Sequence, residues 1–304
     1  MVSLSSTLRQ NTNEPAAPSR PQRRESRQSA RLKFSGWLGI ALVLILFGAA
    51  IVGPSLISTD PAKQSLSDRL LPPVGFGGDW SHPLGTDQLG RDLLARVVSA
   101  ARLSLFIGIT TTIVTGLIGT FLGMAAGYFG GRIDRFVVFL LDVALALPAL
   151  VIAIAVTAVL GGGMSALFIT LISTGWINYS RILRLQTRSL RNAEFTLAAW
   201  SIGAGRFRLL YRHLLPNLFG TIIVLSSQQI AGMMLFAAAL SYLGLGLNAN
   251  QITWGGLVAD GQDLLLTAWW PAAIPGIALA LTVVGFSLAG DALRDLVERP
   301  RGGH

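Results

Sequence analysis

The side chains that could carry catalysis or hold a metal are few and widely spaced in this sequence. There is no cysteine, and the three histidines (His82, His213 and His304) are too scattered to predict a metal site. The nucleotide-binding pattern GxxxxGK[ST], the metalloprotease pattern HExxH and the nucleophile pattern GxSxG are absent, and "GFSLAG" has the wrong spacing. We therefore predict no catalytic residue, no metal ligand and no nucleotide-binding loop in this chain.

Polar residues inside apolar stretches are the next candidates. Asp142 is a carboxylate in a charge-free surrounding, where its burial in lipid is costly and often functional. It suits a polar path or a proton relay. We favour a hydrogen bond or an ion pair between helices, because no second acid or histidine lies at helical spacing. Pro148 predicts a helix kink that either lines such a path or is purely structural. Gln228 and Gln229 suit a polar solute, and they also suit packing between helices.

The stretch "HPLGTDQLGRD" (82–92) combines turn-forming glycines with three charged residues. Asp87, Arg91 and Asp92 either pair with one another or meet a partner protein. The alternative is a capped entry into the following helix, with Thr86 or Asp87 as the N-cap.

The composition of the chain predicts that these residues lie in a membrane domain. The chain is 52% hydrophobic and only 13% charged, whereas soluble domains are nearer a quarter charged. Residues 1–35 are rich in Arg, Ser, Gln and Pro, which predicts a disordered basic tail. A cleaved secretory signal is the competing interpretation, but the next apolar run shows no clear cleavage site.

Charge-free runs predict six transmembrane helices within a domain spanning residues 36–298. Each crossing needs about 20 apolar residues. The stretch "GGGMS" (161–165) divides one run that is too long for a single crossing, and "NANQITWGG" is interpreted as a loop. Trp254, Trp269 and Trp270 are expected at the membrane interface. The predicted spans are 36–57, 102–127, 136–160, 165–186, 218–245 and 270–291.

Basic residues predict the orientation of these spans. Nineteen of the 24 Lys and Arg residues fall on one side, and five fall on the other, between Lys63 and Arg102. The positive-inside rule then places both termini, the short tail 299–304 and the segment 187–216 in the cytoplasm, with 58–101 outside. The net charge of +9 is explained by this asymmetry, so we predict no nucleic-acid partner.

The segment "AEFTLAAWSIGAGRFRLLYRHLLPNL" (193–218) is predicted to form two short helices about a glycine turn at Gly203 and Gly205, with Pro216 as the boundary of the next span. Apolar residues recur on one face of each helix. In the first they are Phe195, Ala198, Ala199 and Ile202, and in the second Phe207, Leu210, Tyr211 and Leu214. The segment suits either an anionic lipid surface, with arginines toward the headgroups, or a groove on a soluble partner.

This segment resembles the EAA loop of permease subunits of binding-protein-dependent ABC importers. The matching positions are Ala198, Ala199, Gly203, Leu215 and Pro216, while Leu197 stands where the family pattern has Glu. Glu194 is a candidate to supply the polar contact instead. The coupling segment that the resemblance implies also includes Ala204, Gly205, Arg206, Arg212 and His213.

Further stretches resemble the C-type permease of the dipeptide, oligopeptide and nickel branch. They include "GYFGGRIDRFVVFLLDVALALPAL" (127–150), "ALSYLGLGL" (239–247) and "FSLAGDALRD" (286–295). The resemblance implies a non-enzymatic subunit with four kinds of partner: a second permease, two ATPase subunits that use ATP and Mg, an external solute-binding protein and the inner membrane. That binding protein is then the candidate partner for Asp87, Arg91 and Asp92.

Two other functions were weighed against this one. A secondary transporter driven by an ion gradient would need inverted repeats and a charged cluster at mid-membrane, and neither is visible in the sequence. An intramembrane enzyme would need a nucleophile beside a base. The sequence leaves the substrate open among dipeptides, oligopeptides, nickel chelates and related small solutes.

Overall fold

The computed structural model describes residues 22–57, 59–247 and 250–298, and all of its regular elements are helical. The predicted tail segments 1–21 and 299–304 lie outside this described part. The long helices are α1 (Gln22–Leu56), α2 (Leu93–Phe129), α3 (Gly131–Ala146), α4 (Ala149–Leu160), α5 (Met164–Arg191), α8 (Leu215–Tyr242) and α10 (Trp270–Glu298). The short helices are η1 (Leu66–Asp68), α6 (Glu194–Ser201), α7 (Arg206–Arg208), η2 (Leu209–Leu214), α9 (Trp254–Gly261) and η3 (Gln262–Leu264).

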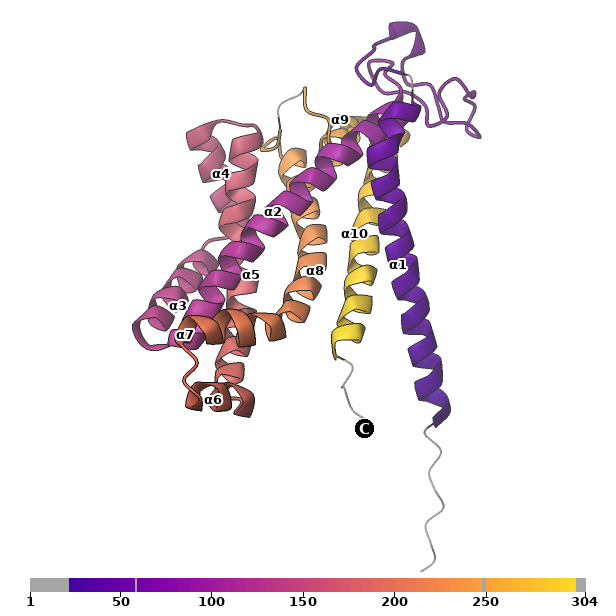
Figure 1. The fold of residues 1–304 in the computed structure, drawn as a ribbon. Helices are drawn as coiled ribbons and strands as arrows, with labels where there is room; N and C mark the ends of the chain where they lie inside the picture. The colour runs from indigo at the N-terminus through magenta and orange to yellow at the C-terminus, as the bar shows by residue number, and fades with distance from the viewer. Residues whose placement is uncertain (1–21, 58, 248–249, 299–304) are drawn as a thin grey trace, which may run out of the picture.

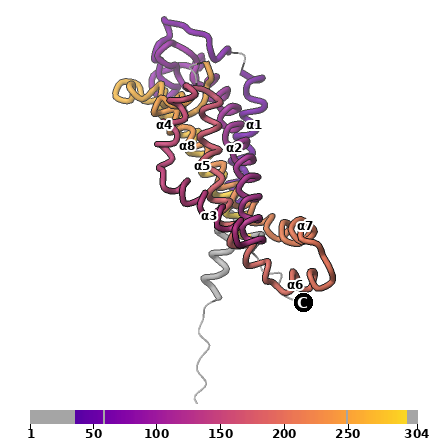
Figure 2. Tube along the Cα trace, turned by 90° about the vertical axis from the view of Figure 1, so that its left-hand side faces the viewer, coloured from indigo at the N-terminus to yellow at the C-terminus, as the bar shows by residue number. Residues whose placement is uncertain are grey.

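The long helices form a bundle with two distinct ends (Figure 1). The segment between α1 and α2 lies at one end together with α9. The start of α1, the end of α10 and the α6–α7 segment lie at the other end. Figure 2 shows that α6 and α7 project sideways from the base of the bundle. This arrangement agrees with the predicted alternation of loops between two membrane faces.

Length and composition identify four helices able to cross a membrane, and up to five when the bent pair α3–α4 is counted as one. The four are Gly36–Leu56, Leu93–Phe129, Arg206–Tyr242 and Trp270–Asp295. Helix α5 is long enough at about 1.5 Å per residue, but its central polar residues make it less apolar than these four. The all-helical membrane fold is confirmed, whereas the count of six crossings stays a prediction.

Two helices begin earlier in the chain than the predicted spans. Residues 22–35, expected to be disordered, continue α1 toward the N-terminus. Once an apolar helix has formed, adding good helix formers such as Arg, Gln, Ala and Leu extends it without a new nucleation step. Helix α2 begins at Leu93 rather than near residue 102, because Asp92 caps it and accepts a hydrogen bond from the Ala95 amide at 2.8 Å.

The predicted third span is a broken helix. Helices α3 and α4 meet at an angle of 85° around Leu147 and Pro148. Proline has no amide hydrogen and disfavours helical backbone at the preceding residue, so the kink expected at Pro148 becomes a complete break. The break predicted at "GGGMS" is confirmed, since α4 ends at Leu160 and α5 begins at Met164.

Helices α2 and α5 pack closely through a ladder of glycines. Gly119, Gly123 and Gly127 repeat every four residues on the side of α2 that faces α5. A Cβ atom added to Gly123 would come within 2.7 Å of the Ser180 carbonyl oxygen, and one on Gly127 within 2.5 Å of the Arg184 carbonyl oxygen. Small residues at this spacing let two backbones approach closely in lipid.

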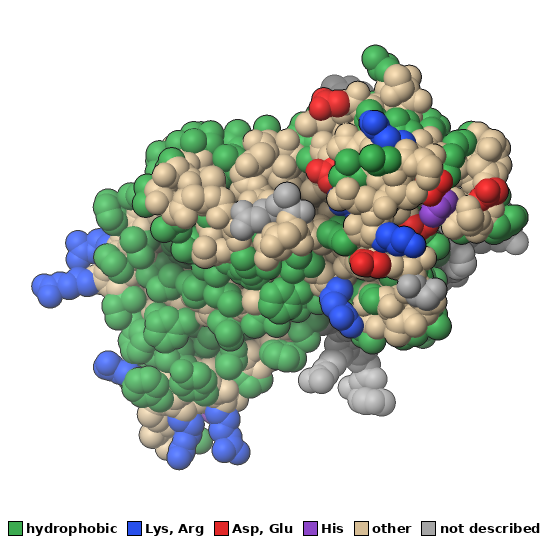
Figure 3. Space-filling view, turned by 90° about the horizontal axis from the view of Figure 1, so that it is seen from above, with side chains coloured by type: hydrophobic (Ala, Val, Ile, Leu, Met, Phe, Trp, Pro, Cys, Tyr) green, Lys and Arg blue, Asp and Glu red, His purple; other side chains and the backbone are tan. Residues whose placement is uncertain are grey.

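The loop expected around "NANQITWGG" contains helix α9, which the sequence analysis missed. Thr253 caps α9 by accepting a hydrogen bond from the Gly256 amide. Trp254 was expected at the membrane interface but is 1% exposed, and its indole Nε1 donates to the Val97 carbonyl at 2.9 Å. Trp270 is also buried. Seen from above, acidic side chains gather on one side of this face together with basic ones, and the other side is mainly hydrophobic (Figure 3).

Candidate functional site

The α6–α7 segment is a helix–turn–helix, as predicted, and Gly203 sets its turn. Gly203 has φ +88°, in the left-handed region where a side chain is strained. Its amide donates to the Trp200 carbonyl at 2.9 Å, and the Ala204 amide donates to the Ala199 carbonyl at 3.1 Å. This pair of hydrogen bonds is the Schellman motif, which ends α6 and satisfies its last carbonyls. Gly205 then precedes α7 with an ordinary φ of −65°.

Thr196 and Ala199 attach α6 to the rest of the chain, and Ala199 is the one buried member of the predicted apolar face. Both are buried, and the Thr196 hydroxyl donates to the Leu190 carbonyl at 2.7 Å, at the end of α5. Sequence reasoning missed Thr196, although its spacing of three from Ala199 places both on one helix face. In the second helix Leu210 and Leu214 are buried as the periodicity predicted, whereas Phe207 and Tyr211 are exposed.

An exposed apolar patch therefore faces away from the bundle. We call it the docking patch, and it comprises Phe195, Ile202, Phe207 and Tyr211. Ile202 is 87% exposed and Phe207 is 72% exposed. Apolar side chains exposed together at one end of the bundle, outside the predicted spans, are typical of an interaction surface.

The other predicted coupling residues lie around this patch. Glu194 is exposed in the first turn of α6, where a carboxylate is favoured by the helix dipole. Ala198, Leu197, Arg206 and Arg212 are exposed, while Ala204, His213 and Leu215 are partly buried.

Pro216 lies in the first turn of α8, at the boundary where it was predicted. The helix runs on from α7 through the π-helical segment η2, and the Leu215 amide donates to the Leu210 carbonyl five residues back.

The four residues predicted to line a path lie in three different surroundings. Asp142 and Pro148 are exposed along the broken α3–α4 pair, and no ion pair to Asp142 occurs among the described residues. Gln229 donates to the Gly175 carbonyl at 3.1 Å and so packs α8 against α5. Gln228, its neighbour, lines an open cleft of about 270 Å³ together with Gln186 and Thr221. The role of these residues in a path stays a prediction.

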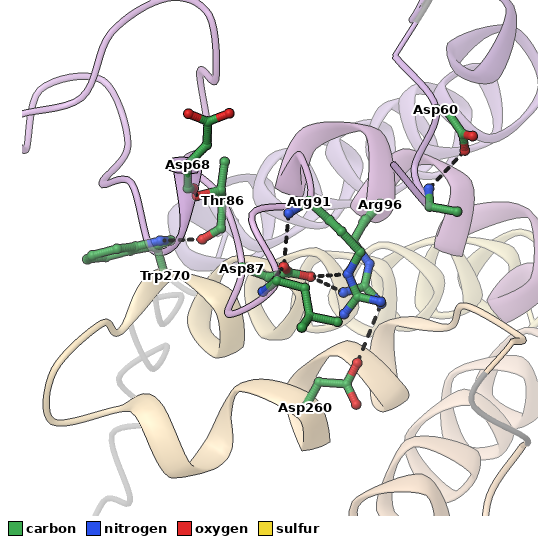
Figure 4. Close-up of polar contacts among 10 residues, drawn as sticks. Asp60, Asp68, Thr86, Asp87, Arg91, Arg96, Asp260 and Trp270 are labelled. Atoms are coloured by element: carbon green, nitrogen blue, oxygen red, sulfur yellow. Dashed lines mark hydrogen bonds and ion pairs between the residues drawn. The ribbon is translucent and has the colours of Figure 1, made fainter. Parts of the chain in front are cut away.

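The charged residues of 82–92 form a buried network (Figure 4). Asp87 is 5% exposed and accepts hydrogen bonds from the Leu89 amide at 2.8 Å, the Arg91 amide at 3.0 Å and Arg91 Nε at 2.6 Å. Arg96, 3% exposed, pairs with Asp87 and reaches Asp260 of α9 at 3.5 Å. The network ties the segment between α1 and α2, which we name the outer segment after its predicted side of the membrane, to α2 and α9.

These contacts form a capped entry into α2, one of the roles considered for this stretch. Asp87 and Asp92 are buried and bonded within the chain, and only Arg91 is partly exposed, so the capped helix entry is what the structure contains. Its N-cap is Asp92, not Thr86 or Asp87 as expected. Thr86 instead accepts from the Leu71 amide and donates to the Asp68 carbonyl. Contact of Asp87, Arg91 and Asp92 with a binding protein stays a prediction.

The electrostatics of Asp87 follow from these contacts. Burial alone would raise the pKa of the Asp87 carboxyl. The amides of Arg91 and Leu89 and the guanidinium of Arg96 outweigh burial, and the pKa is lowered from its usual value. Asp87 is therefore a carboxylate at neutral pH. Among the described residues, no group of three or more His, Cys, Asp or Glu side chains is arranged to hold a metal ion.

Fold and site together define a multi-pass helical membrane protein with an exposed helix–turn–helix at one end of its bundle. Residues 119–301 match the family described as "Binding-protein-dependent transport system inner membrane component". The match covers more than half of the chain, and the chain belongs to this family of ABC importer permeases.

Three relatives place the chain within the family. It is 36% identical to the dipeptide transport system permease protein DppC of Bacillus subtilis, covering 86% of this chain and 80% of that protein. It is 35% identical to the probable D,D-dipeptide transport system permease protein DdpC of Escherichia coli and 34% identical to the oligopeptide transport system permease protein OppC of B. subtilis. The latter two alignments each cover 86% of this chain, and 86% and 84% of those proteins.

A solved structure supports the fold. A chain of the MetNI methionine ABC transporter, in an inward-facing conformation, superimposes with a TM-score of 0.55 at 15% identity, covering 67% of this chain and 97% of that chain. At this identity the likeness concerns the fold alone. The resemblance inferred from the EAA-type segment and the branch-specific stretches is thus confirmed.

Proposed function

We propose that this chain is the permease subunit of an ATP-driven peptide importer, and that its α6–α7 segment transmits the motion of an ATPase subunit to the spanning helices. Family membership supports the importer, and the exposed docking patch at one end of the bundle, outside the predicted spans, supports the coupling role. Dipeptides or short oligopeptides are the proposed substrates, because the relatives above carry those names.

The assembly proposed around the chain contains four further subunits. A second permease, expected to be a paralogue, completes the pathway, and two cytoplasmic ATPases bind ATP and Mg²⁺. A solute-binding protein delivers the peptide on the outer side. Both termini lie in the cytoplasm, and Asp142, Pro148 and Gln228 are proposed to border the pathway.

The coupling proposal makes a prediction about Gly203. Val at this position would have to adopt φ +88°, which a β-branched residue strongly disfavours, so the turn would change its angle. We expect Gly203→Val to insert normally but to lose most ATP-dependent peptide uptake, of the order of tenfold or more. Ala199→Arg should act likewise, because it places a charge at a buried contact between α6 and the bundle. Uptake by the complete transporter in proteoliposomes measures both effects.

Gly205 provides a matched control. It lies two residues away, is exposed, and already has an ordinary φ, so Gly205→Ala should reduce uptake much less than Gly203→Ala. Normal uptake by Gly203→Val would contradict the coupling role. Uptake driven by a proton gradient without ATP, and insensitive to vanadate, would contradict the importer itself.

A further inference from the structure

A cleft of about 320 Å³ lies where the cytoplasmic-side ends of α2 and α5 meet the α6–α7 segment. Arg191 and Arg206 contribute its charged lining, and Tyr128, Phe129 and Trp200 contribute aromatic walls. None of the described residues that line it is acidic. The cleft thus combines two positive charges with an aromatic surface.

The two arginines are not neutralised within the described part of the chain. Both are exposed, and neither forms an ion pair with another described residue. Arg191 Nη1 lies 3.7 Å from the place that a Cβ atom would take on Gly130, which puts its guanidinium over the turn between α2 and α3. Guanidinium groups are suited to phosphate because they can donate two parallel hydrogen bonds.

An apolar track on α2 leads into the same cleft. Leu117 and Phe121 are exposed, and their spacing of four residues places them on one face of the helix, within about one leaflet thickness of the cleft. Tyr128, seven residues after Phe121, continues this face and lines the cleft. Figure 2 shows α2 on the side of the bundle from which α6 and α7 project.

These features together select one kind of occupant. A free phosphate ion or a carboxylate of a partner protein would use the arginines but not the apolar track. A phospholipid uses both, with its headgroup at the arginines and its acyl chains along α2. Aromatic side chains at the ends of spanning helices suit the same depth, where headgroups meet hydrocarbon.

We propose that this cleft is a binding site for the phosphate headgroup of an anionic phospholipid in the cytoplasmic leaflet. The lipid supports the α6–α7 segment from the membrane side, while the docking patch stays free for a protein partner. The proposal depends on the orientation of the chain in the membrane and not on transport.

Leu197 gives the site a sharp test, because its side chain lines the cleft beside the arginines. A carboxylate at this position would neutralise them from within the chain and compete with the lipid phosphate. Leu197→Glu should therefore abolish the lipid preference, whereas Leu197→Gln, which has nearly the same shape and no charge, should keep it.

The experiment measures lipid retention by the purified full-length chain in native mass spectrometry. The chain is incubated with equal amounts of phosphatidylglycerol and phosphatidylcholine of identical acyl chains. We expect a roughly tenfold preference for phosphatidylglycerol, on the scale that one or two arginines near a membrane surface provide. The double variant Arg191→Gln, Arg206→Gln should bind the two lipids equally. The double variant Arg135→Gln, Arg208→Gln removes the same charge from exposed positions outside the cleft and should keep the preference.

Several outcomes would overturn the proposal. Equal retention of the two lipids by the unmodified chain would show that no such site exists. An equal loss in both double variants would show that binding follows overall charge and not this cleft. Displacement of the lipid by inorganic phosphate would identify a free anion as the ligand. Unchanged lipid preference with weakened ATPase binding in Arg191→Gln, Arg206→Gln would assign the cleft to a carboxylate of the ATPase. A transporter that does not couple would leave the lipid result unaffected, so the two proposals fail independently.

Discussion

At the scale of single residues, the outer network depends on the charge of Asp87. This carboxylate holds two amides and two arginines, and both Asp87 and Arg96 are almost completely buried. Replacing it with Asn leaves Arg96 with a buried, uncompensated charge. We expect Asp87→Asn to destabilise the outer segment by about 3 kcal/mol, as for other buried pairs that lose one partner. Hydrogen exchange of the Leu89 and Arg91 amides measures this loss.

The same network predicts a dependence on pH with a definite sign. The pKa of Asp87 is lower in the folded chain than its unfolded value of about 3.9. The stabilisation that the ionised Asp87 gives to the folded chain is therefore complete above about pH 4, and it is lost as the pH falls through the folded pKa. Amide protection in 86–93, corrected for intrinsic exchange, should fall in acid for the natural chain and change much less for Asp87→Asn. Asp79→Asn removes a charge from a fully exposed site and serves as the control. Equal acid sensitivity of all three chains would rule out Asp87 as the responsible group.

At the scale of helices, the contact between α2 and α5 rests on glycines that have no room for a side chain. Gly123→Ala would push a methyl group toward the Ser180 carbonyl, and we expect a loss of about 1–3 kcal/mol. Gly232 in α8 has nothing within 4 Å of its added Cβ, so Gly232→Ala gains helix propensity without a collision. When thermal unfolding is measured in detergent, Gly123→Ala should therefore have a lower Tm than the natural chain, and Gly232→Ala should not. A Tm for Gly123→Ala at or above that of Gly232→Ala would contradict this packing.

The sequence predicted those elements whose causes are local. Pro148, the glycines at 161–163 and Gly203 act through their own backbone, and the breaks they predicted are present. The elements it missed depend on partners far along the chain. Helix α2 tolerates Arg96 in its first turn because Asp87 and Asp260 neutralise it, and Asp260 is 164 residues away.

The candidate sites show the same division. Gln228 and Gln229 are adjacent and chemically identical, and only the position of α5 assigns one to packing and the other to a cleft. Trp254 is likewise of a residue type expected at the membrane interface. Its buried position depends on another helix, because its indole Nε1 donates to the Val97 carbonyl of α2. Motif spacing located the α6–α7 segment, but it gave no sign that Thr196 anchors it, because the carbonyl that Thr196 bonds belongs to the backbone of α5.

At the scale of the whole molecule, the membrane topology can be measured with single introduced cysteines, because the natural chain has none. Trp80 and Leu266 are exposed at one end of the bundle and Ile202 at the other, so a single cysteine at each position should be accessible from one side only. We expect an impermeant thiol reagent added to intact cells to label Trp80→Cys and Leu266→Cys, and to label Ile202→Cys only after lysis. This pattern requires an odd number of crossings between Trp80 and Ile202, which α2, the broken α3–α4 pair and α5 supply together. If α3–α4 instead turned back within the membrane while α2 and α5 both crossed, Trp80→Cys and Ile202→Cys would label from the same side.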